Sequence, residues 1–356
     1  MDHRSTAKRP PRQFASTDAH ARHVVIGSRG SALAMWQTNW VIDQLTQAVP
    51  GLVATVKEIT TQGDRTQRLE IPLAALGDKS MFVAELERAL LNGQLDVAVQ
   101  PMNDLTLSQA EHHIASPVID AAVHSLKDLP GVIDDRLVLA AVTRREDSRD
   151  VLVSRFGYTL ATLPAGATVA TSSLRRRAQL LMVRPDLRIV DIRGNVDTRV
   201  RKSLAEDGPD ATVLASAGLH RLGLEAHVSE YLPVEIITPA AGQGALAVEI
   251  RADDEASRVL CQTIDHAPTR YAVTAERAVL AALGGGCRVP LGVHAIVDND
   301  CESMDITAVV ASVDGKSHVR ATRRGTVVSA ETLGRLIADE LLAGGAAEIL
   351  RTIREG

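Results

Sequence analysis

The pattern of hydrophobic and polar positions predicts strands alternating with helices along the first two thirds of the chain. Residues 23–27 form a short apolar run, and Leu33, Trp36 and Trp40 then recur on one helical face before Pro50 ends the helix. The further predicted strands are 54–60, 137–142, 168–171, 188–192 and 211–215, and the further predicted helices are 82–91, 174–184 and 196–204. This alternation is typical of an α/β fold with mixed, mostly parallel sheets.

The last third of the chain has a different pattern. Its predicted elements are helices over 274–283 and 330–342 and strands over 293–297, 306–313 and 318–322. Asp314-Gly315 is a good hairpin signal between the last two strands. We therefore expect a smaller α+β domain with an antiparallel sheet, and three domains in all, which suits a chain of 356 residues.

The ends and the composition narrow the class of protein. Residues 1–23 are polar and lack the apolar stretch of a secretory signal, so we predict a disordered tail. A transit peptide is the alternative, although Asp2 and Asp18 oppose it. No apolar run approaches the roughly 18 residues that a membrane span needs. The three cysteines form no C-x-x-C pair, which favours a reducing compartment, and we predict a cytoplasmic protein with no membrane partner.

The segment 171–203 is strongly basic, with nine Lys or Arg against three Asp in a chain whose net charge is −5. A solvated helix face is the ordinary explanation for such a run. However, Arg175 and Arg176 fall in the first turn of a predicted helix, where the macrodipole disfavours cations. Arg193 and Arg199 flank another strand-to-helix turn, and such turns line the ligand crevice of open α/β sheets.

These arginines, close to free helix N–H groups, predict a site for a ligand that carries several carboxylates. Arg29 and Ser31, in the first strand-to-helix turn, would form the opposite wall. No phosphate-binding G-x-x-x-x-G-K-[ST] loop is present, so a nucleoside triphosphate is not expected. Nucleic acid is not expected either, because the chain is acidic and only 2% aromatic.

Two further stretches carry candidate chemistry. Lys127-Asp128 ends a strand-like run, where an aspartate could stabilise a developing cation or shuttle a proton; a plain turn residue is the alternative. Cys287 follows three glycines and is either a covalent anchor or a space-filling side chain. We expect Cys261 in the core and Cys301 in an exposed loop. His112-His113 lacks partners at metal-ligand spacing, so we predict no metal site.

One frame occurs twice. VAVQPMNDLT (97–106) and AAVHSLKDLP (121–130) overlay at an offset of 24 residues and share D-x-A-V-x-x-x-x-D-L. The first copy has Asn103-Asp104 where the second has Lys127-Asp128. A sheet position admits one strand, so one copy must be displaced.

With these pieces in place, the chain resembles the porphobilinogen deaminase (hydroxymethylbilane synthase) family from about residue 24 to about residue 355. The resemblance rests on ordered motifs: IGSRGSALAMWQ, TTQGD, HSLKDLP, TSSLRRRAQL, IRGNVDTR, AGLHRLGL, PAAGQGALAVE and TAERAVLAALGGGCRVPLG. It implies two domains similar to periplasmic binding proteins with a cleft between them, and a third domain. It also implies a dipyrromethane cofactor, held by a cysteine, to which four porphobilinogen units are added with loss of ammonia. Water then releases hydroxymethylbilane.

The resemblance assigns roles residue by residue. Cys287 matches the cofactor anchor, and Asp128 matches the catalytic Asp whose charge stabilises the cation formed as ammonia leaves, with Lys127 beside it. The matched cofactor-binding residues are Cys287, Ser172, Ser173, Arg175, Arg176, Lys127, Asp128 and Arg199. The matched substrate-binding residues are Arg29, Ser31, Arg193, Asn195, Arg221, Gln243 and Lys79.

The resemblance also implies an organisation and a monomeric state. The predicted domains are 24–143 with 244–263, then 147–239, then 266–356. Ala75 stands where many members have a second lysine, which leaves that contact in question. The family passes directly from the 90–93 helix end into one HS-[LM]-KD strand, whereas here about 24 residues intervene.

Two alternatives to an active deaminase stay open. Either the first copy loops out whole, which we favour because Pro101 suits the end of a central strand poorly, or it takes the sheet position and misplaces Asp128. In the second case the chain would be an impaired homologue. A two-lobed binder of an anionic ligand is the remaining alternative, but a periplasmic binder needs an export signal, which we do not find in residues 1–23, and needs no cysteine-bearing third domain.

Overall fold

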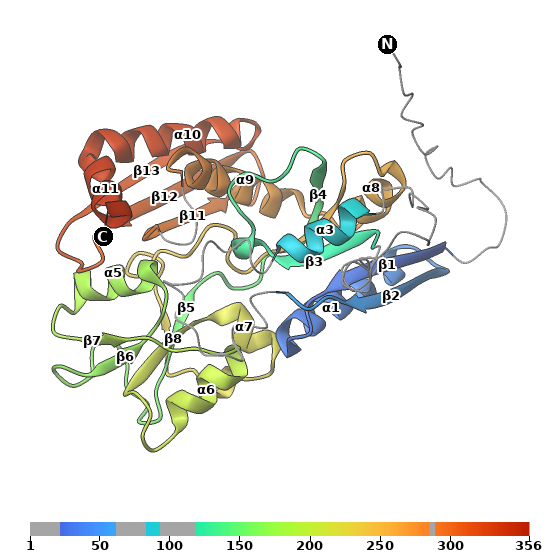
Figure 1. Cartoon of the computed structure of the whole chain (residues 1–356). Helices are drawn as coiled ribbons and strands as arrows, with labels where there is room; N and C mark the ends of the chain where they lie inside the picture. The colour runs from blue at the N-terminus through green and yellow to red at the C-terminus, as the bar shows by residue number, and fades with distance from the viewer. Residues whose placement is uncertain (1–21, 62–82, 93–118, 285–288, 356) are drawn as a thin grey trace, which may run out of the picture.

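The computed structural model describes residues 22–61, 83–92, 119–284 and 289–355. Their strands form three separate sheets, visible as three groups in Figure 1. No helix within these residues is long and apolar enough to cross a bilayer. The α/β class with two mixed sheets and a smaller antiparallel sheet is confirmed.

The first sheet has the order β2-β1-β3-β10-β4. Its strands are β1 (Arg22–Ser28), β2 (Leu52–Glu58), β3 (Ala121–Ser125), β4 (Leu137–Val142) and β10 (Leu246–Arg251). Strand β1 is parallel to both β2 and β3, whereas β10 runs antiparallel to β3 and to β4. The helices of this part are α1 (Ala32–Ala48), α3 (Ala84–Asn92) and α8 (Glu255–Gln262).

The strand between β1 and β10 shows which of the two copies of the repeated frame lies in the sheet. It is β3, part of the second copy, and four of its five residues are buried. Asp120, just before it, accepts a 2.9 Å hydrogen bond from the Val25 amide and so fixes the start of the pairing. The preference for the second copy in this position is therefore confirmed. The first copy lies outside the described residues.

The second sheet repeats the same arrangement with the order β7-β6-β8-β5-β9. Its strands are β5 (Asp150–Val153), β6 (Thr168–Ala170), β7 (Arg188–Val190), β8 (Ala211–Ala215) and β9 (Glu230–Leu232). Strand β6 is parallel to β7 and β8, and β5 is the reversed strand, antiparallel to β8 and β9. Its helices are α5 (Leu174–Val183), α6 (Val196–Leu204) and α7 (Ser216–Arg221).

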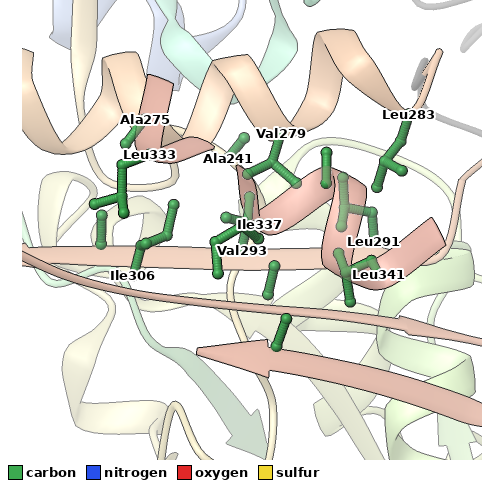
Figure 2. Close-up of a cluster of buried hydrophobic side chains, with 14 of the residues drawn as sticks. Ala241, Ala275, Val279, Leu283, Leu291, Val293, Ile306, Leu333, Ile337 and Leu341 are labelled. Atoms are coloured by element: carbon green, nitrogen blue, oxygen red, sulfur yellow. The ribbon is translucent and has the colours of Figure 1, made fainter. Parts of the chain in front are cut away.

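The third sheet is antiparallel, in the order β11-β12-β13, with strands Leu291–Val297, Ser303–Ala311 and His318–Thr326. The helices α9 (Ala267–Ala282) and α10 (Ala330–Leu341) pack on it, and Figure 2 shows Val279 of α9 and Ile337 of α10 pointing toward the strands. A short π-helix (Leu342–Ala346) leads into α11 (Ala347–Glu355). This apolar layer gives the third part its own core.

The chain crosses between the first and second sheets twice, from β4 to β5 and from β9 to β10. These crossing segments are bonded to each other, because the Glu146 amide donates to the Gly244 carbonyl at 3.2 Å. Gly244 has a φ of +91°, and a Cβ there would lie 2.4 Å from the Glu146 carbonyl oxygen. Only glycine therefore fits this approach. The third part touches the same segments, since the Val293 amide donates to the Pro239 carbonyl.

Several predicted boundaries were wrong by two or more residues, among them those of β2 (predicted over 54–60), β12 (306–313) and β13 (318–322). Two further cases have a clear physical reason. Strand β1 begins at Arg22, inside the tail predicted over 1–23; the remainder of that tail lies outside the described residues. Helix α9 begins at Ala267, seven residues before the predicted start. Pro268 occupies the first turn, where a missing N–H costs nothing, and the His266 side chain caps the helix. The division into three domains stays a prediction.

Candidate active site

The predicted site residues gather at the carboxyl ends of parallel strands in the first two sheets. They follow β1 (Arg29, Ser31), β3 (Lys127, Asp128), β6 (Ser172, Ser173, Arg175, Arg176), β7 (Arg193, Asn195, Arg199) and β8 (Arg221). Carboxyl ends of parallel strands are where open α/β sheets bind ligands. The topology therefore places these residues at the sheet edges where a ligand site is expected.

Asp128 lies in a short 3₁₀ helix, Leu126–Asp128, directly after β3. The buried Leu126 anchors this turn, and its amide donates to the Ala245 carbonyl at 3.0 Å. One residue earlier, Ser125 exchanges hydrogen bonds with the buried Gln37 side chain of α1, at 2.9 and 3.2 Å. The turn is thus fixed from two sides, while Lys127 and Asp128 are only half-buried.

A line of hydrogen bonds runs from this turn across to the second sheet. Lys127 Nζ donates to Gln243 Oε1 at 3.5 Å. Gln243, buried in the second crossing segment, donates through Nε2 to Asp150 Oδ1 at 2.9 Å and to the Ser148 carbonyl at 2.8 Å. Gln243 therefore joins the two halves of the site.

Asp150 is a fully buried carboxylate at the start of β5, and it pairs with two of the predicted ligand arginines. Arg175 Nη1 donates to Oδ2 at 2.7 Å, and Arg176 donates to Oδ1 through Nη2 at 2.7 Å and through Nε at 3.1 Å. Burial alone would raise the pKa of Asp150, but the charges of Arg175 and Arg176 outweigh it and hold the pKa well below its usual range.

This pairing changes the explanation of Arg175 and Arg176. Both side chains are buried, and they also donate to the Thr238 and Val213 carbonyls respectively. Two cations in a first helical turn do indicate an anion, but the anion seen here is a carboxylate of the same chain. Their binding of cofactor carboxylates stays a prediction.

Arg176, Arg193 and Arg199 form an arginine cluster, and the charge of Asp128 acts on Arg199 from the first sheet. The pKa of Arg199 is lowered to about 10, mainly by burial and then by the positive charges of Arg176 and Arg193, against the opposing charge of Asp128. Arg199 Nε also donates to the Gly194 carbonyl at 2.8 Å, which holds the guanidinium over the turn that starts α6. Groups from both sheets thus share one electrostatic environment.

The smaller polar residues shape the turns. Ser31 and Ser173 are N-caps that accept from Ala34 N and Arg176 N. The Ser172 hydroxyl bridges to Ile192, donating to its carbonyl at 2.8 Å and accepting from its amide at 3.1 Å, so it ties the β6 turn to the β7 turn. Asn195 is the N-cap of α6 but makes no side-chain cap hydrogen bond.

Arg221 lies at the junction of the two sheets. Its Nη2 donates to the Gly244 carbonyl at 2.7 Å, and its guanidinium lies 5.9 Å from the ring centroid of Trp36 on α1. The pKa of Arg221 is lowered to about 10, mainly by burial, with Glu146 acting in the opposite direction. Helix α1 thus meets α7 at this junction.

Several predicted residues cannot be placed. Cys287, Lys79 and the first copy with Asn103-Asp104 lie outside the described residues. Cys261 lies in the hydrophobic core of the first sheet, as expected, and burial there raises the pKa of its thiol to about 12. Cys301 is exposed, as expected. Among the described residues, no group of three or more His, Cys, Asp or Glu is placed to hold a metal ion.

Sequence reasoning missed Asp150 and Gln37. The signal for Asp150 was weak but present, since an aspartate opens the otherwise apolar run Asp150–Val153 ahead of the arginine-rich segment. Gln37 sat inside a motif that was noted for other residues. Both act through contacts with residues far along the chain, which no local pattern reveals.

Comparison with known proteins decides the family. Residues 24–118 and 107–259 match "Porphobilinogen deaminase, dipyromethane cofactor binding domain", and residues 270–343 match "Porphobilinogen deaminase, C-terminal domain". The chain belongs to the porphobilinogen deaminase family. The first match is broken into two pieces that both include 107–118, between the two copies of the repeated frame.

Named relatives in this family cover nearly the whole chain. The porphobilinogen deaminase of Desulforudis audaxviator is 47% identical over 335 residues, 94% of this chain and 99% of that protein. That of Geobacter metallireducens is 45% identical over 328 residues, 92% of this chain and 94% of that protein. Among solved structures, a nutrient binding protein from Burkholderia cenocepacia bound to methionine aligns with a TM-score of 0.38 and 14% identity over 68% of this chain and 90% of that one. This last likeness is too low to bear on function.

Proposed function

We propose that the protein is a hydroxymethylbilane synthase that joins four porphobilinogen molecules head to tail on a dipyrromethane attached to Cys287. Each addition releases ammonia, and water finally releases hydroxymethylbilane. The observation that carries the proposal is that Asp128 lies on a turn anchored by Leu126 and that its charge acts on Arg199 of the second sheet. Family membership supplies the reaction class.

The side chains present fit a ligand with several carboxylates. At the second sheet, one internal carboxylate, Asp150, faces two arginines, so this buried group keeps an excess of positive charge. Arg193 and Arg199 add to it. Arginine guanidinium groups bind carboxylates through paired hydrogen bonds, and their charge is effective in a partly buried site. When bound, the dipyrromethane would supply the pyrrole to which the first porphobilinogen is joined, and each later unit would join the end of the growing chain.

Within this reaction, the residues of the chain divide the work. The carboxylate of Asp128 stabilises positive charge that develops on the substrate as its amino group leaves, because it is held in place before the reaction begins. Lys127, tied to Gln243, keeps the turn oriented toward the second sheet. The arginine cluster binds the acidic side chains and so positions the substrate against Asp128.

The organisation follows from the same proposal. The first sheet would belong to a domain formed by 24–143 and 244–263, and the second sheet to a domain formed by 147–239. These two domains would lie on either side of the site, and 266–356 would form the third domain. We place the enzyme in the cytoplasm as a monomer. The second copy in the sheet supports an active enzyme, since Asp128 then follows β3 directly at the site.

Intact-mass measurement of the purified protein tests the proposal. The wild type should exceed the mass of its bare chain by a dipyrromethane, and Cys287→Ser should have the bare mass. Cys301→Ser is the matched control, because Cys301 is exposed and should leave the added mass in place. A wild-type protein of bare-chain mass, expressed with porphobilinogen available, would remove the proposed function.

A further inference from the structure

The turn that carries Asp128 continues onto helix α9 of the third part. After Asp128 comes the buried Leu129, then Pro130 and Gly131. Gly131 lies directly against α9, where an added Cβ would be 3.3 Å from both the Cα and the amide nitrogen of Ala281. The Asp128 turn (residues 126–131) is therefore packed between the first sheet and α9.

Arg277 of α9 holds this turn by its backbone. Its Nη2 donates to the Pro130 carbonyl at 2.8 Å and to the Gly131 carbonyl at 3.2 Å. Those carbonyls lie two and three residues beyond Asp128. A single guanidinium nitrogen that bridges two successive carbonyls fixes the direction of the chain as it leaves the turn.

Buried charges of the first sheet lie near Arg277. Glu249 on β10 has no exposed surface, and it is the group whose charge opposes the lowering of the Arg277 pKa by burial. Glu249 Oε2 lies 3.1 Å from His124 Nε2 on β3, and its Oε1 has no hydrogen-bond partner among the described residues. Thus β3, β10 and α9 are linked by charge behind the turn that presents Asp128.

Helix α9 also leads toward the cysteine loop. The helix ends at Ala282, and Cys287 follows five residues later in the sequence. One rigid helix therefore holds the Asp128 turn along its side and precedes the predicted cofactor anchor at its end. A shift of the turn along α9 would move Asp128 relative to the substrate without touching any ligand-binding arginine.

We infer that Arg277 is a positioning residue for the proposed reaction, which fixes the Asp128 turn on helix α9 so that the Asp128 carboxylate stays at the reacting bond. The inference rests on the proposed function. Arg277 donates to the backbone carbonyls of the Asp128 turn and not to the arginine cluster, so its loss should act on the chemical step rather than on binding. A misplacement of about 1 Å at a reacting group costs up to about 100-fold in rate.

Arg277→Met removes both carbonyl contacts but keeps an apolar stem. Arg270→Met is the matched control, because Arg270 lies two turns earlier on the same helix and likewise donates to backbone carbonyls, those of Leu139 and Ala140. Measurements are kcat and KM for porphobilinogen, intact mass and the unfolding midpoint. We expect Arg277→Met to carry the cofactor mass, with kcat lower by about 10- to 100-fold and KM within about threefold. Arg270→Met should lose stability but keep kcat.

Four results would overturn the inference. They are an equal kcat in the two variants, a raised KM with unchanged kcat in Arg277→Met, the loss of its cofactor mass, and a kcat loss that merely follows its unfolded fraction. If Arg277→Met does not fold, Arg277→Gln is measured instead; it removes the charge and shortens the side chain, and a wild-type kcat in the folded Arg277→Gln protein contradicts a positioning role. Failure of the proposed function would appear separately, as a wild type without cofactor mass.

Discussion

The first and second sheets have the same strand order but opposite chemistry at their strand ends. In both, the parallel core strands lie beside one reversed strand, β10 in the first and β5 in the second. The first sheet carries Arg29 after β1 and a tight turn with Lys127-Asp128 after β3, whereas the second ends in arginines at three successive turns. The shared scaffold fixes where functional groups stand, and the side chains decide that the first half supplies the carboxylate and the second most of the anion-binding cations.

Each reversed strand also buries one carboxylate, and its position along the strand differs. Asp150 lies opposite Ala215, the last residue of β8, so it reaches Arg175, Arg176 and Gln243 at the site. Glu249 lies opposite Ala122, near the start of β3, and contacts His124 behind the site. A difference of a few residues in position along equivalent strands therefore places the Asp150 carboxylate at the site and the Glu249 carboxylate behind it.

Removing the carboxylate of the first sheet should have the largest effect. Asp128→Asn keeps the size of the side chain but loses its charge, so we expect turnover to fall about 10²–10⁴-fold with an unchanged unfolding midpoint. Porphobilinogen consumption measures it. Asp104→Asn in the first copy is the control and should leave turnover near wild type. A crippled Asp104→Asn with an active Asp128→Asn would mean that the wrong copy had been assigned.

Removing the buried carboxylate of the second sheet should instead cost stability. Asp150→Asn leaves Arg175 and Arg176 buried without their counter-ion, which costs about 3–5 kcal/mol of unfolding free energy in urea titration. Asp147→Asn, in a partly exposed pair with Arg149, should cost only about 0.2–1 kcal/mol. Equal losses in the two variants would show that Asp150 is no special counter-ion.

The pairing of Asp150 with Arg175 and Arg176 predicts a pH dependence of stability. Because the pKa of Asp150 is held below its usual range, its contribution is complete above the ordinary Asp pKa of about 4 and is lost as the pH falls toward the folded-state pKa. The stability difference between wild type and Asp150→Asn should therefore be constant above about pH 5 and narrow below about pH 4. A difference that widens in acid would contradict this pairing.

A ligand arginine of the second sheet should affect binding more than chemistry. Arg193→Gln should raise KM about tenfold with little change in kcat, since a hydrogen bond to a charged group contributes about 1.5–3 kcal/mol. Arg201→Gln, exposed on α6, is the control and should leave both constants unchanged. Equal kinetics in the two variants would remove Arg193 from the site.

The inserted copy should matter least. Deleting residues 95–118 shortens the connection from α3 to the second copy, as in the family pattern, and leaves the buried Ile119, β3 and the Asp128 turn intact. We expect the unfolding free energy to change by less than about 1 kcal/mol and turnover to persist, because loop length affects stability only weakly. An insoluble or inactive deletion variant would show that the first copy has a role of its own.

The sequence pattern predicted the bounds of helices and strands well where the apolar run and the flanking turn or cap residues indicate the same ends. Helix α6, strand β4 and strand β8 have the predicted bounds, since turn residues flank a clear periodic run in each. The start of α9 could not be found in this way, because Pro268 reads as a breaker until its place in the first turn is known. Asp150 could not be found either, since its partners depend on how β5 and α5 pack.

The signals for charge were sound but incomplete. The unfavourable position of Arg175 and Arg176 pointed correctly to an anion, yet the sequence could not tell a ligand from Asp150. The choice between the two copies depended on which strand pairs with β1 and β10, a long-range property that Pro101 only hinted at. The roles of the individual site residues remain predictions for the experiments above.

The division of work between the two sheets is tested most directly by following intact mass with time after mixing porphobilinogen with Asp128→Asn and with Arg193→Gln. Asp128→Asn should carry the cofactor mass and gain added pyrrole units only very slowly, at every substrate concentration. Arg193→Gln should gain them slowly at low concentration and near the wild-type rate at high concentration. Normal elongation in Asp128→Asn, or an Arg193→Gln that stalls at saturating substrate, would contradict the assignment of the carboxylate to chemistry and the arginines to binding.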